Sequence, residues 1–544
     1  MDSYDFIVVG GGSAGCVLAA RLSEDPNTSV CLLEAGGKDT SPFIHTPVGA
    51  VAMLPTKYNN WGFETVPQAG LNGRKGYQPR GKTLGGSSSI NSMMYARGHR
   101  YDYDLWASLG NQGWSYDECL PYFKKAEHNE VHNDEFHGQG GPLNVADLRS
   151  PSEMLEKYLQ ACESIGVPRN KDINGSEQLG AMATQVTQIN GERCSAAKAY
   201  LTSNLSRSNL TVMTKATTHK VLFRDKRAIG VEYGLAGKRF QIKCRKEVIL
   251  SAGAFGSPQI LLLSGVGPKQ ELDKHGIYQV HELAGVGDNL QDHIDLIHSY
   301  KCSAKKSTFG ISLQMATEMS RALPEWRRHR SGKLTSNYAE GIGFFCSDED
   351  VKIPDVEFVF VVAVVDDHAR KIHLSHGFSS HVTLLRPKSK GTVKLRSGDP
   401  YDSPSIDPAF FSHPDDMPVM IKAWKKQHQM LESEAFDDVR GESFYPVDAS
   451  DDKAIEQDIR NRADTQYHPV GTCKMGMEQD PLAVVDNDLS VYGLESLRVV
   501  DASIMPTLIG GNTNAPTIMI AEKVADKIKL KYGLCKDYIG ERLA

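Results

Sequence analysis

Apolar residues near the start of the chain fall in short continuous runs separated by glycine-rich or polar segments. Residues 4–9 predict a buried strand that is apolar and β-branched, and residues 30–33 predict a second strand. Between them, residues 16–22 predict a helix that ends near Asp25 and Pro26. A strand, a helix and a strand in this order indicate an α/β fold with a parallel sheet.

The apolar pattern returns later and changes character in the middle of the chain. Residues 247–254 and 497–500 predict further buried strands, and a helix is predicted from about Pro516 to residue 530. Residues 300–458 instead alternate short strands with charged turns, which is typical of an antiparallel sheet. We therefore expect a second domain, α+β in character, beside the parallel sheet.

The turn after the first predicted strand carries a dinucleotide-binding fingerprint. Gly10, Gly12 and Gly15 occupy the three glycine positions of G-x-G-x-x-G, and Glu34 lies at the end of the next strand, where it would bind a ribose. The expected contacts in this unit also include Ser13, Ala14 and Ala35. Residues 11–15 also fit the G-x-S-x-G nucleophile elbow of hydrolases, but that elbow follows later strands and explains no acid such as Glu34.

Composition and charge narrow the class of protein. The 544 residues have a formal net charge of −6 and no long run of like charge, so nucleic acid is not an expected partner. The first strand begins too early to leave room for a signal peptide, and the apolar run at 358–365 is too short to span a bilayer. Ten scattered cysteines without a C-x-x-C motif indicate reduced thiols, so we expect a cytoplasmic protein.

Two long stretches carry a resemblance to a known family. Residues 81–91 (GKTLGGSSSIN), continuing to Arg97 and Gly98, resemble the first signature of the glucose–methanol–choline (GMC) flavoprotein oxidoreductases, and residues 253–267 (GAFGSPQILLLSGVG) resemble the second. The resemblance runs from about residue 4 to about residue 530. It implies a discontinuous Rossmann-like FAD-binding domain made of residues 1–155, 190–299 and 459–544. Residues 156–189 and 300–458 then form the substrate-binding domain, whose antiparallel sheet covers the flavin.

The resemblance also implies which residues contact FAD. Some family members attach the flavin covalently to a histidine in the first signature, but this chain has Ile90 there, so we expect non-covalent FAD. Besides the residues of the N-terminal unit, the expected contacts are Gly81, Leu84, Gly85, Gly86, Ser87, Asn91, Ser92, Met93, Met94, Val221, Ala252, Gly253, Asp501, Ala502, Thr513 and Pro516.

The expected catalytic residues lie in the last part of the chain. His468 precedes a proline that restricts its backbone, and histidine is suited to proton transfer near neutral pH. The resemblance implies that His468 is the catalytic histidine and Asn514 its partner. His468 would remove the proton of an alcohol while hydride passes to flavin N5 and an aldehyde forms. Pro516 begins a helix whose N-terminus would stabilise the reduced flavin.

The substrate and the electron acceptor are less closely defined. Within the family the chain resembles bacterial dehydrogenases of primary aliphatic alcohols, with choline dehydrogenases next. We expect a medium-chain alcohol and a quinone-type acceptor, with Glu340 and Tyr467 as substrate contacts. Choline, which Glu340 would bind through its ammonium group, is the alternative substrate. An oxidase that uses O₂ and, more remotely, an FAD-containing hydroxynitrile lyase are alternative functions.

Two further segments contain residue types that can bind a metal ion or a membrane surface. His128, His132 and His137 lie in a polar stretch, which we interpret as a solvated loop, so no metal site is predicted. Residues 311–326 place apolar side chains near helical spacing before the basic run 327–330. We interpret this segment as a surface helix packed on its own domain; peripheral contact with the inner face of the cytoplasmic membrane is the alternative.

Overall fold

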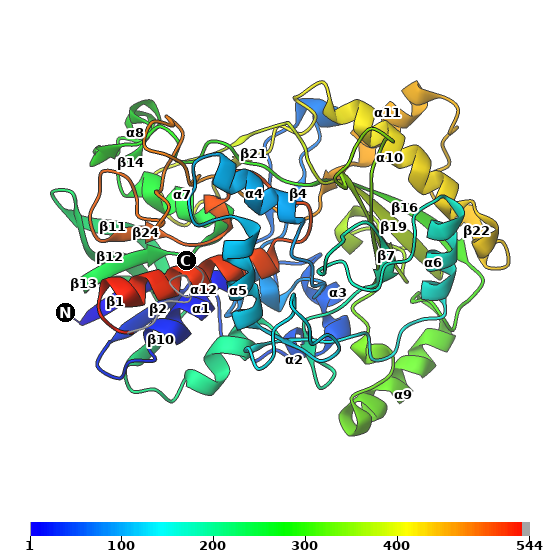
Figure 1. Ribbon diagram of the computed structural model, residues 1–544, viewed down its shortest axis with the longest axis horizontal. Helices are drawn as coiled ribbons and strands as arrows, with labels where there is room; N and C mark the ends of the chain where they lie inside the picture. The colour runs from blue at the N-terminus through cyan, green and yellow to red at the C-terminus, as the bar shows by residue number, and fades with distance from the viewer. Residues whose placement is uncertain (1, 536–544) are drawn as a thin grey trace.

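The computed structural model describes residues 2–535, and it contains two seven-stranded sheets at opposite ends of an elongated molecule (Figure 1). The first sheet is near the N-terminus and the second lies among α6, α10 and α11. The predicted α/β fold with a second, antiparallel sheet is confirmed.

The first sheet has the order β10-β2-β1-β13-β12-β11, with β24 paired to β13. Strands β10, β2, β1, β13 and β24 are parallel, whereas β11, β12 and β13 form an antiparallel meander. The central strand β1 is buried from Phe6 to Val9, as its apolar run predicts. The strands of this sheet are β1 (Ser3–Val9), β2 (Val30–Glu34), β10 (Leu210–Thr214), β11 (Thr217–Arg224), β12 (Arg227–Leu235), β13 (Lys238–Leu250) and β24 (Leu497–Val499).

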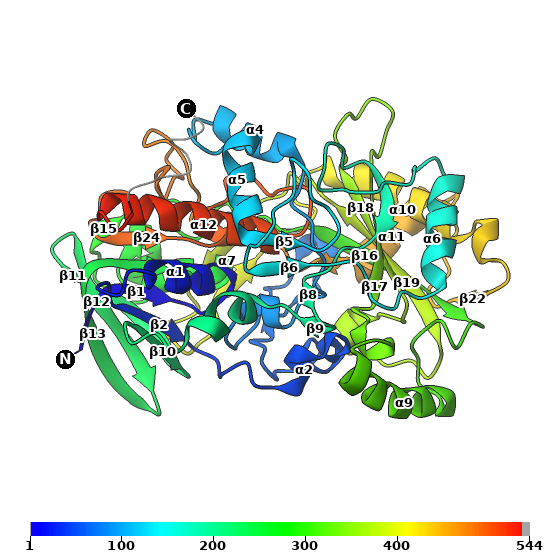
Figure 2. The ribbon, with the colours of Figure 1, turned by 60° about the horizontal axis from the view of Figure 1, so that its bottom comes forward.

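Two helices from opposite ends of the chain lie side by side on this sheet (Figure 2). They are α1 (Ser13–Leu22) and α12 (Asn514–Lys531), and α12 runs from the middle of the molecule outwards. Arg21 of α1 and Glu522 of α12 form an ion pair at 2.7 Å, and Tyr200 donates to the same carboxylate at 2.8 Å. The pairing brings the N-termini of both helices to the same region of the molecule, where the cavity described below lies.

The second sheet has the order β22-β16-β19-β18-β17-β7, with β23 paired to β16, and every pair is antiparallel. Helices α6 (Met154–Ser164), α10 (Asp416–Leu431) and α11 (Asp452–Arg462) pack on it. Its strands are β7 (Gly180–Ala183), β16 (Ile294–Cys302), β17 (Ala339–Phe345), β18 (Val356–Val361), β19 (Gly377–Leu384), β22 (Arg440–Ser443) and β23 (Asp464–Thr465). Strand β16 thus joins this sheet from residue 294, before the domain boundary expected at residue 300.

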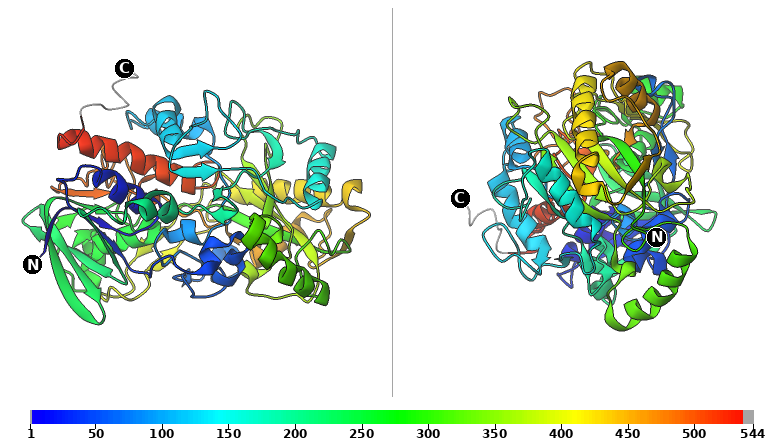
Figure 3. Two further views of the ribbon diagram at one scale, coloured as in Figure 1. Left: turned by 90° about the horizontal axis from the view of Figure 1, so that it is seen from below. Right: turned by 90° about the vertical axis from the view of Figure 1, so that its right-hand side faces the viewer.

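The remaining elements connect or flank the two sheets (Figure 3). They are the helices α2 (Pro42–His45), α3 (Ala50–Met53), α4 (Arg100–Ser108), α5 (Tyr116–Ala126), α7 (Gly253–Leu263) and α8 (Lys269–Lys274), and the short strands β3 (Phe63–Glu64), β4 (Tyr77–Gln78), β5 (Glu127–Asn129), β6 (Leu143–Val145), β8 (Gln188–Ile189), β9 (Glu192–Arg193), β14 (Val266–Gly267), β15 (His281–Glu282), β20 (Thr392–Lys394) and β21 (Ser405–Asp407).

Helix α9 (Leu313–His329) lies at the periphery of the molecule (Figure 2). Met315 and Ala322 are buried, and the indole of Trp326 donates to the carbonyl of Gly191 at 2.7 Å. Leu313 is 90% exposed, so only part of the apolar stripe is covered. Within residues 2–535, no helix combines the length and the apolar character needed to cross a bilayer.

Candidate active site

One continuous cavity of about 410 Å³ is lined by residues of both sheets and extends from Glu34 to His468. This volume falls in the range of small-molecule sites. Most residues predicted to bind the cofactor or substrate line it: Gly10, Gly12, Ser13, Ala14, Glu34, Ala35, Gly81, Gly86, Ser87, Asn91, Ser92, Met93, Met94, Ala252, Gly253, Tyr467, His468, Asp501, Ala502, Thr513 and Asn514.

The glycine fingerprint packs against the turn after β13. A Cβ on Gly10 would lie 2.4 Å from the carbonyl oxygen of Ser251, and one on Gly15 would lie 1.8 Å from the carbonyl oxygen of Gly10. Gly12 is different, because its Cβ would meet nothing closer than 4.0 Å. Gly10 and Gly15 are therefore required by the protein itself, whereas Gly12 leaves space in front of the N-terminus of α1, where a phosphate group is favoured.

Glu34 closes the cavity at the end of β2. Its carboxylate accepts hydrogen bonds from the backbone N–H groups of Gly11 at 2.8 Å and Gly36 at 2.6 Å. Burial raises the pKa of Glu34 to about 7, and the two backbone hydrogen bonds oppose that rise. A carboxylate held in this way can accept further hydrogen bonds from ribose hydroxyls.

The segment from Gly81 to Met94 lies across the fingerprint. The N–H of Gly85 donates to the carbonyl of Gly11 at 2.7 Å, and a Cβ on Gly86 would lie 2.7 Å from the Cα of Gly12. Leu84 and Gly85 therefore hold this segment in place and do not line the cavity. Ile90 is only 2% exposed and lines the cavity.

Other predicted contacts also lie outside the cavity lining. Pro516 is in the first turn of α12 and Gly15 is inside α1. Val221 is buried farther along β11, where its N–H donates to the hydroxyl of Ser264 at 2.8 Å. The cavity is instead lined by the start of this strand, at residues 216–218. The position that the resemblance implies, Val221, therefore lies on the strand whose start lines the cavity, but Val221 itself does not line it.

Glu340 is not a substrate contact in the structure. It is a buried residue of β17, outside the cavity lining, and accepts hydrogen bonds from Ser152 N at 2.6 Å and Ser336 Oγ at 2.8 Å. Burial raises its pKa. The prediction that Glu340 binds a substrate cation is therefore wrong, because its carboxylate holds the chain at residues 152 and 336. Tyr467 does line the cavity, and its hydroxyl lies 2.7 Å from His368 Nδ1.

His468 is held on three sides. Its backbone N–H donates to Asp292 at 2.9 Å, its Nδ1 lies 2.9 Å from Nδ1 of His293, and its Nε2 lies 3.3 Å from Nδ2 of Asn512. His293 is not among the residues that the sequence predicts for this site. It comes from the start of the second sheet, 175 residues away in sequence.

The hydrogen bonds of this chain assign the proton positions of both histidines. Nε2 of His293 lies 3.1 Å from the carbonyl oxygen of Leu385, which can only accept, so this nitrogen carries the proton. Nδ1 of His293 is then an acceptor, and the N–H at Nδ1 of His468 donates a hydrogen bond to it. His468 is left with a lone pair on Nε2. Burial lowers the pKa of His293 to about 3 and holds the pKa of His468 well below its usual range, so both rings are neutral at pH 7.

The asparagine beside His468 is Asn512, not Asn514. Oδ1 of Asn514 accepts a hydrogen bond from the hydroxyl of Ser13 at 2.7 Å, so this side chain ties the N-terminus of α12 to that of α1. The prediction that Asn514 partners His468 is therefore corrected to Asn512. Asn512 and Asn514 are separated by one residue, so the sequence alone does not show which of them faces His468. The path of the backbone before α12 decides it.

Buried polar atoms test whether the cavity fits a polar cofactor. Arg80 lines the cavity, and its Nε and Nη2 are buried without a hydrogen-bond partner in residues 2–535; the same holds for Oδ1 of Asn512. Burial lowers the pKa of Arg80 to about 10. Because buried polar groups are normally hydrogen-bonded, these donors and this acceptor in the cavity lining fit a polar ligand. At the other end of the cavity, Glu34 and the space at Gly12 fit an adenosine and a pyrophosphate.

Comparison with known proteins agrees with this geometry. Residues 4–295 match the N-terminal model and residues 387–521 the C-terminal model of the GMC oxidoreductases. The chain belongs to the GMC oxidoreductase family. It is therefore a flavoprotein oxidoreductase that acts on alcohols, and members of this family bind FAD.

Relatives of this GMC oxidoreductase include enzymes for different alcohols. It is 45% identical to an alcohol dehydrogenase (acceptor) of Pseudomonas putida, over 97% of this chain and 96% of the relative. It is 43% identical to the mitochondrial choline dehydrogenase of Homo sapiens, over 97% and 90% of the two chains. The structure of pyridoxine 4-oxidase from Mesorbium loti has a TM-score of 0.87 and 29% identity, covering 98% of this chain and all of the other.

Proposed function

We propose that this GMC oxidoreductase oxidises an uncharged primary aliphatic alcohol of medium chain length to the aldehyde, with non-covalent FAD and a quinone-type electron acceptor. The observation that carries the proposal is the position of His468: its Nε2 lies 3.3 Å from Nδ2 of Asn512, and both residues line the same cavity as the dinucleotide fingerprint.

His468 and Asn512 act on the hydroxyl group of the substrate. Nε2 of His468 accepts the hydroxyl proton, and Nδ2 of Asn512 donates a hydrogen bond to the same oxygen, which becomes negative as the proton leaves. His293 holds His468 in the tautomer that leaves Nε2 free, so it is a positioning residue. When bound, FAD supplies the acceptor for the hydride. Gly10, Gly12 and Glu34 would hold its adenosine diphosphate part, and residues 91–94 and 501–502 its ring.

The lining of the substrate chamber favours an uncharged substrate. Among the described residues, the carboxylates that line the cavity are Glu34 and Asp501, and both belong to its cofactor half. Asp295 lies behind the lining and is already bound by His381 Nδ1 at 2.6 Å and Thr383 Oγ1 at 3.1 Å. A quaternary ammonium group would need a free carboxylate or an aromatic cage. The second sheet and the segment after β18 contribute Tyr338, Ala339, Val359, Val361, Ala363, Val364 and Val365, so this part of the lining is mostly aliphatic; Tyr338 and Tyr467 add aromatic rings without a carboxylate beside them in the lining.

Anaerobic reduction of the bound flavin tests the reaction and the substrate class. We expect straight-chain primary alcohols to bleach the flavin absorbance, and choline at the same concentrations to have little effect. Bleaching by choline but not by the aliphatic alcohols would refute the substrate class and favour choline dehydrogenase. A protein that holds FAD but is reduced by neither kind of alcohol would refute the proposed reaction.

The electron acceptor is tested by repeating the reaction in air. A dehydrogenase that uses a quinone should turn over rapidly with a soluble quinone and form little hydrogen peroxide. Peroxide formed in proportion to the alcohol consumed would show an oxidase instead. The partly exposed apolar stripe and basic C-terminus of α9 would suit peripheral contact with an anionic membrane that holds a quinone. Co-sedimentation with anionic vesicles at low salt tests that contact, and its absence would remove it.

The non-covalent state of FAD is tested by denaturation. Ile90 occupies the position of the histidine that attaches flavin in some family members, and an aliphatic side chain cannot form that bond. We therefore expect the yellow colour to remain in solution when the denatured protein is precipitated. Colour that stays with the polypeptide would refute this part of the proposal.

A further inference from the structure

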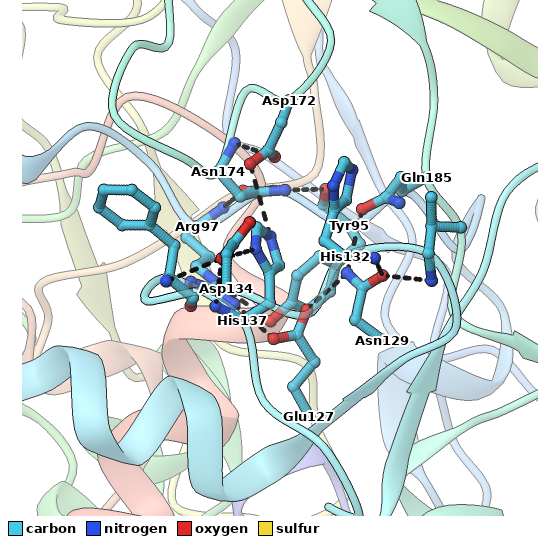
Figure 4. A network of polar contacts seen from close by, with 12 residues as sticks. Tyr95, Arg97, Glu127, Asn129, His132, Asp134, His137, Asp172, Asn174 and Gln185 are labelled. Carbon is cyan, nitrogen blue, oxygen red and sulfur yellow. Dashed lines mark hydrogen bonds and ion pairs between the residues drawn. The ribbon is translucent and has the colours of Figure 1, made fainter.

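A second group of polar side chains lies away from the cavity, where the loop between β5 and β6 meets the segment after α6 (Figure 4). It consists of His132, Asp134, His137 and Asp172, which we call the His132 cluster, and none of the four lines the cavity. The sequence predicts a solvated loop here. That prediction is wrong for His137, which is only 2% exposed.

Each carboxylate of the His132 cluster uses one oxygen to hold its own loop. Oδ1 of Asp134 accepts from the N–H groups of Phe136 at 2.9 Å and His137 at 3.1 Å, and from Nδ1 of His137 at 2.8 Å. Oδ1 of Asp172 accepts from the N–H of Asn174 at 2.9 Å. The Oδ2 atoms take no part in these hydrogen bonds. Each aspartate is therefore fixed in orientation while one oxygen stays available to a ligand.

His137 presents a nitrogen lone pair to one of these oxygens. Because its Nδ1 donates to Asp134, the neutral ring has no proton on Nε2. This Nε2 is buried, has no hydrogen-bond partner in residues 2–535, and lies 3.6 Å from Oδ2 of Asp172. A lone pair facing a carboxylate oxygen is repulsive unless a proton or a metal ion lies between them. The separation is too long for a hydrogen bond, but two tetrahedral ligands each about 2.0–2.1 Å from a zinc ion lie roughly 3.4 Å apart.

His132 completes the set. A ring nitrogen of His132 and carboxylate oxygens of Asp134 and Asp172 all lie within 4.8 Å of one another. The rings of His132 and His137 are also neighbours, with centroids 4.9 Å apart. We propose that the His132 cluster binds one divalent transition-metal ion of the Zn²⁺ type, through ring nitrogens of His132 and His137 and a carboxylate oxygen of Asp172, while Asp134 holds His137 from its other ring nitrogen.

The donor set selects the class of metal. Ca²⁺ and Mg²⁺ prefer oxygen ligands alone, whereas imidazole together with carboxylate suits Zn²⁺ and its neighbours Co²⁺ and Ni²⁺. Two carboxylates also balance the charge of a divalent ion. The hydrogen bond from His137 Nδ1 to Asp134 fixes the tautomer of that histidine, as the second ring nitrogen of a metal-bound histidine commonly does.

The position of the cluster makes the ion structural. Asn174, two residues after Asp172, accepts from the N–H of Arg97 at 2.9 Å and donates to the carbonyl of Tyr95 at 3.2 Å. Arg97 in turn forms a buried ion pair at 2.6 Å with Glu127, at the start of the loop that carries His132. Residues 95–97 directly follow Met93 and Met94, which line the cavity. The ion would therefore fix this loop to the segment that continues into the cofactor site, without touching substrate.

The test measures Zn²⁺ binding to the FAD-loaded enzyme after treatment with a chelator. We expect one Zn²⁺ per chain by calorimetric titration, a higher melting temperature when Zn²⁺ is added, and an unchanged flavin spectrum. The decisive variant is His132→Ala, because within residues 2–535 the His132 ring makes no hydrogen bond that would hold the fold, and its loss should weaken Zn²⁺ binding roughly 100-fold or more. Asp172→Asn tests a second ligand.

His413→Ala is the matched control, since His413 lies beside Asp415 at the surface, 3.9 Å away, and has no second carboxylate of this kind. This variant should bind Zn²⁺ like the wild type. If the wild type binds no Zn²⁺, the proposal fails, and a proton shared by His137 and the two aspartates explains the cluster. Equal Zn²⁺ binding by the wild type and His132→Ala would place the ion elsewhere and would equally refute the proposal. Neither outcome depends on alcohol oxidation, so failure here leaves the proposed function untouched.

Discussion

Replacing His293 with leucine tests whether the tautomer of His468 controls proton removal. The substitution introduces an apolar side chain of similar size. It removes the ring nitrogen that accepts the hydrogen bond from His468 Nδ1. That proton then has no partner, which costs about 1–3 kcal/mol for a buried group. The other tautomer gains in the same step, because its Nε2 proton can donate to Oδ1 of Asn512 once that amide has turned over; Nδ2 is the atom beside Nε2 before the substitution.

The expected loss of rate follows from this energy. A tautomer equilibrium shifted by about 1–3 kcal/mol lowers the fraction of His468 that has a free Nε2 by roughly 5- to 150-fold. We therefore expect anaerobic flavin reduction, measured by stopped flow at saturating alcohol near pH 8, to slow by that factor while FAD remains bound. His293→Gln offers both a donor and an acceptor and should recover part of the rate.

The pH profile separates this effect from a loss of fold. In the wild type, burial holds the pKa of His468 well below its usual range, so the rate should stay level through neutral pH and fall only in acid. His293 contributes to that low pKa, so the acid limb of His293→Leu should move to higher pH. A variant with full FAD content that reduces flavin at the wild-type rate and with the wild-type pH profile would refute the tautomer assignment.

Three further predictions concern the asparagines, the ribose end and the fingerprint. Asn512→Ala should slow flavin reduction by roughly 10- to 100-fold with FAD content unchanged, whereas Asn514→Ala should mainly weaken FAD binding and stability; the reverse pattern in stopped-flow and FAD-content measurements would restore Asn514 as the partner. The dissociation constant of FAD should rise as pH falls below about 7, since Glu34 then takes up a proton and loses acceptor capacity. Glu34→Gln should bind FAD more weakly, with little pH dependence between pH 5 and 8. A dissociation constant of the wild type that stays constant over this range in a fluorescence titration would contradict the role of Glu34. Gly15→Ala should prevent folding or FAD loading, because its Cβ would lie 1.8 Å from the carbonyl oxygen of Gly10, and a soluble yellow protein with a wild-type melting temperature would show that this packing can relax.

Local sequence determined the framework of this protein. The apolar runs of β1, β2 and β13, the three glycines and Glu34 are all set by backbone geometry over a few residues, so their spacing is enough to predict the first sheet and one end of the cofactor site. The change to alternating strands after residue 300 predicted the antiparallel sheet for the same reason. The resemblance to the family added His468 and the flavin.

The tertiary structure decided which side chains meet. His293 reaches His468 across 175 residues, and the carbonyl of Leu385 sets the tautomer of both, which no local pattern records. Asn512 and Asn514 are two positions apart, and their side chains point to different partners. Asn512 lies beside His468, whereas Asn514 is hydrogen-bonded to Ser13.

Burial was decided in the same way. The sequence predicts Glu340 as a substrate contact and His137 as part of a solvated loop. In the structure Glu340 is hydrogen-bonded to Ser336, and His137 to Asp134. A charged or polar side chain gives no local sign of its partner, because the partner is chosen by the packing of whole elements. Local sequence is therefore enough to predict the glycine turn and Glu34 at one end of the cofactor site, whereas the packing of the two sheets determines which residues lie beside His468.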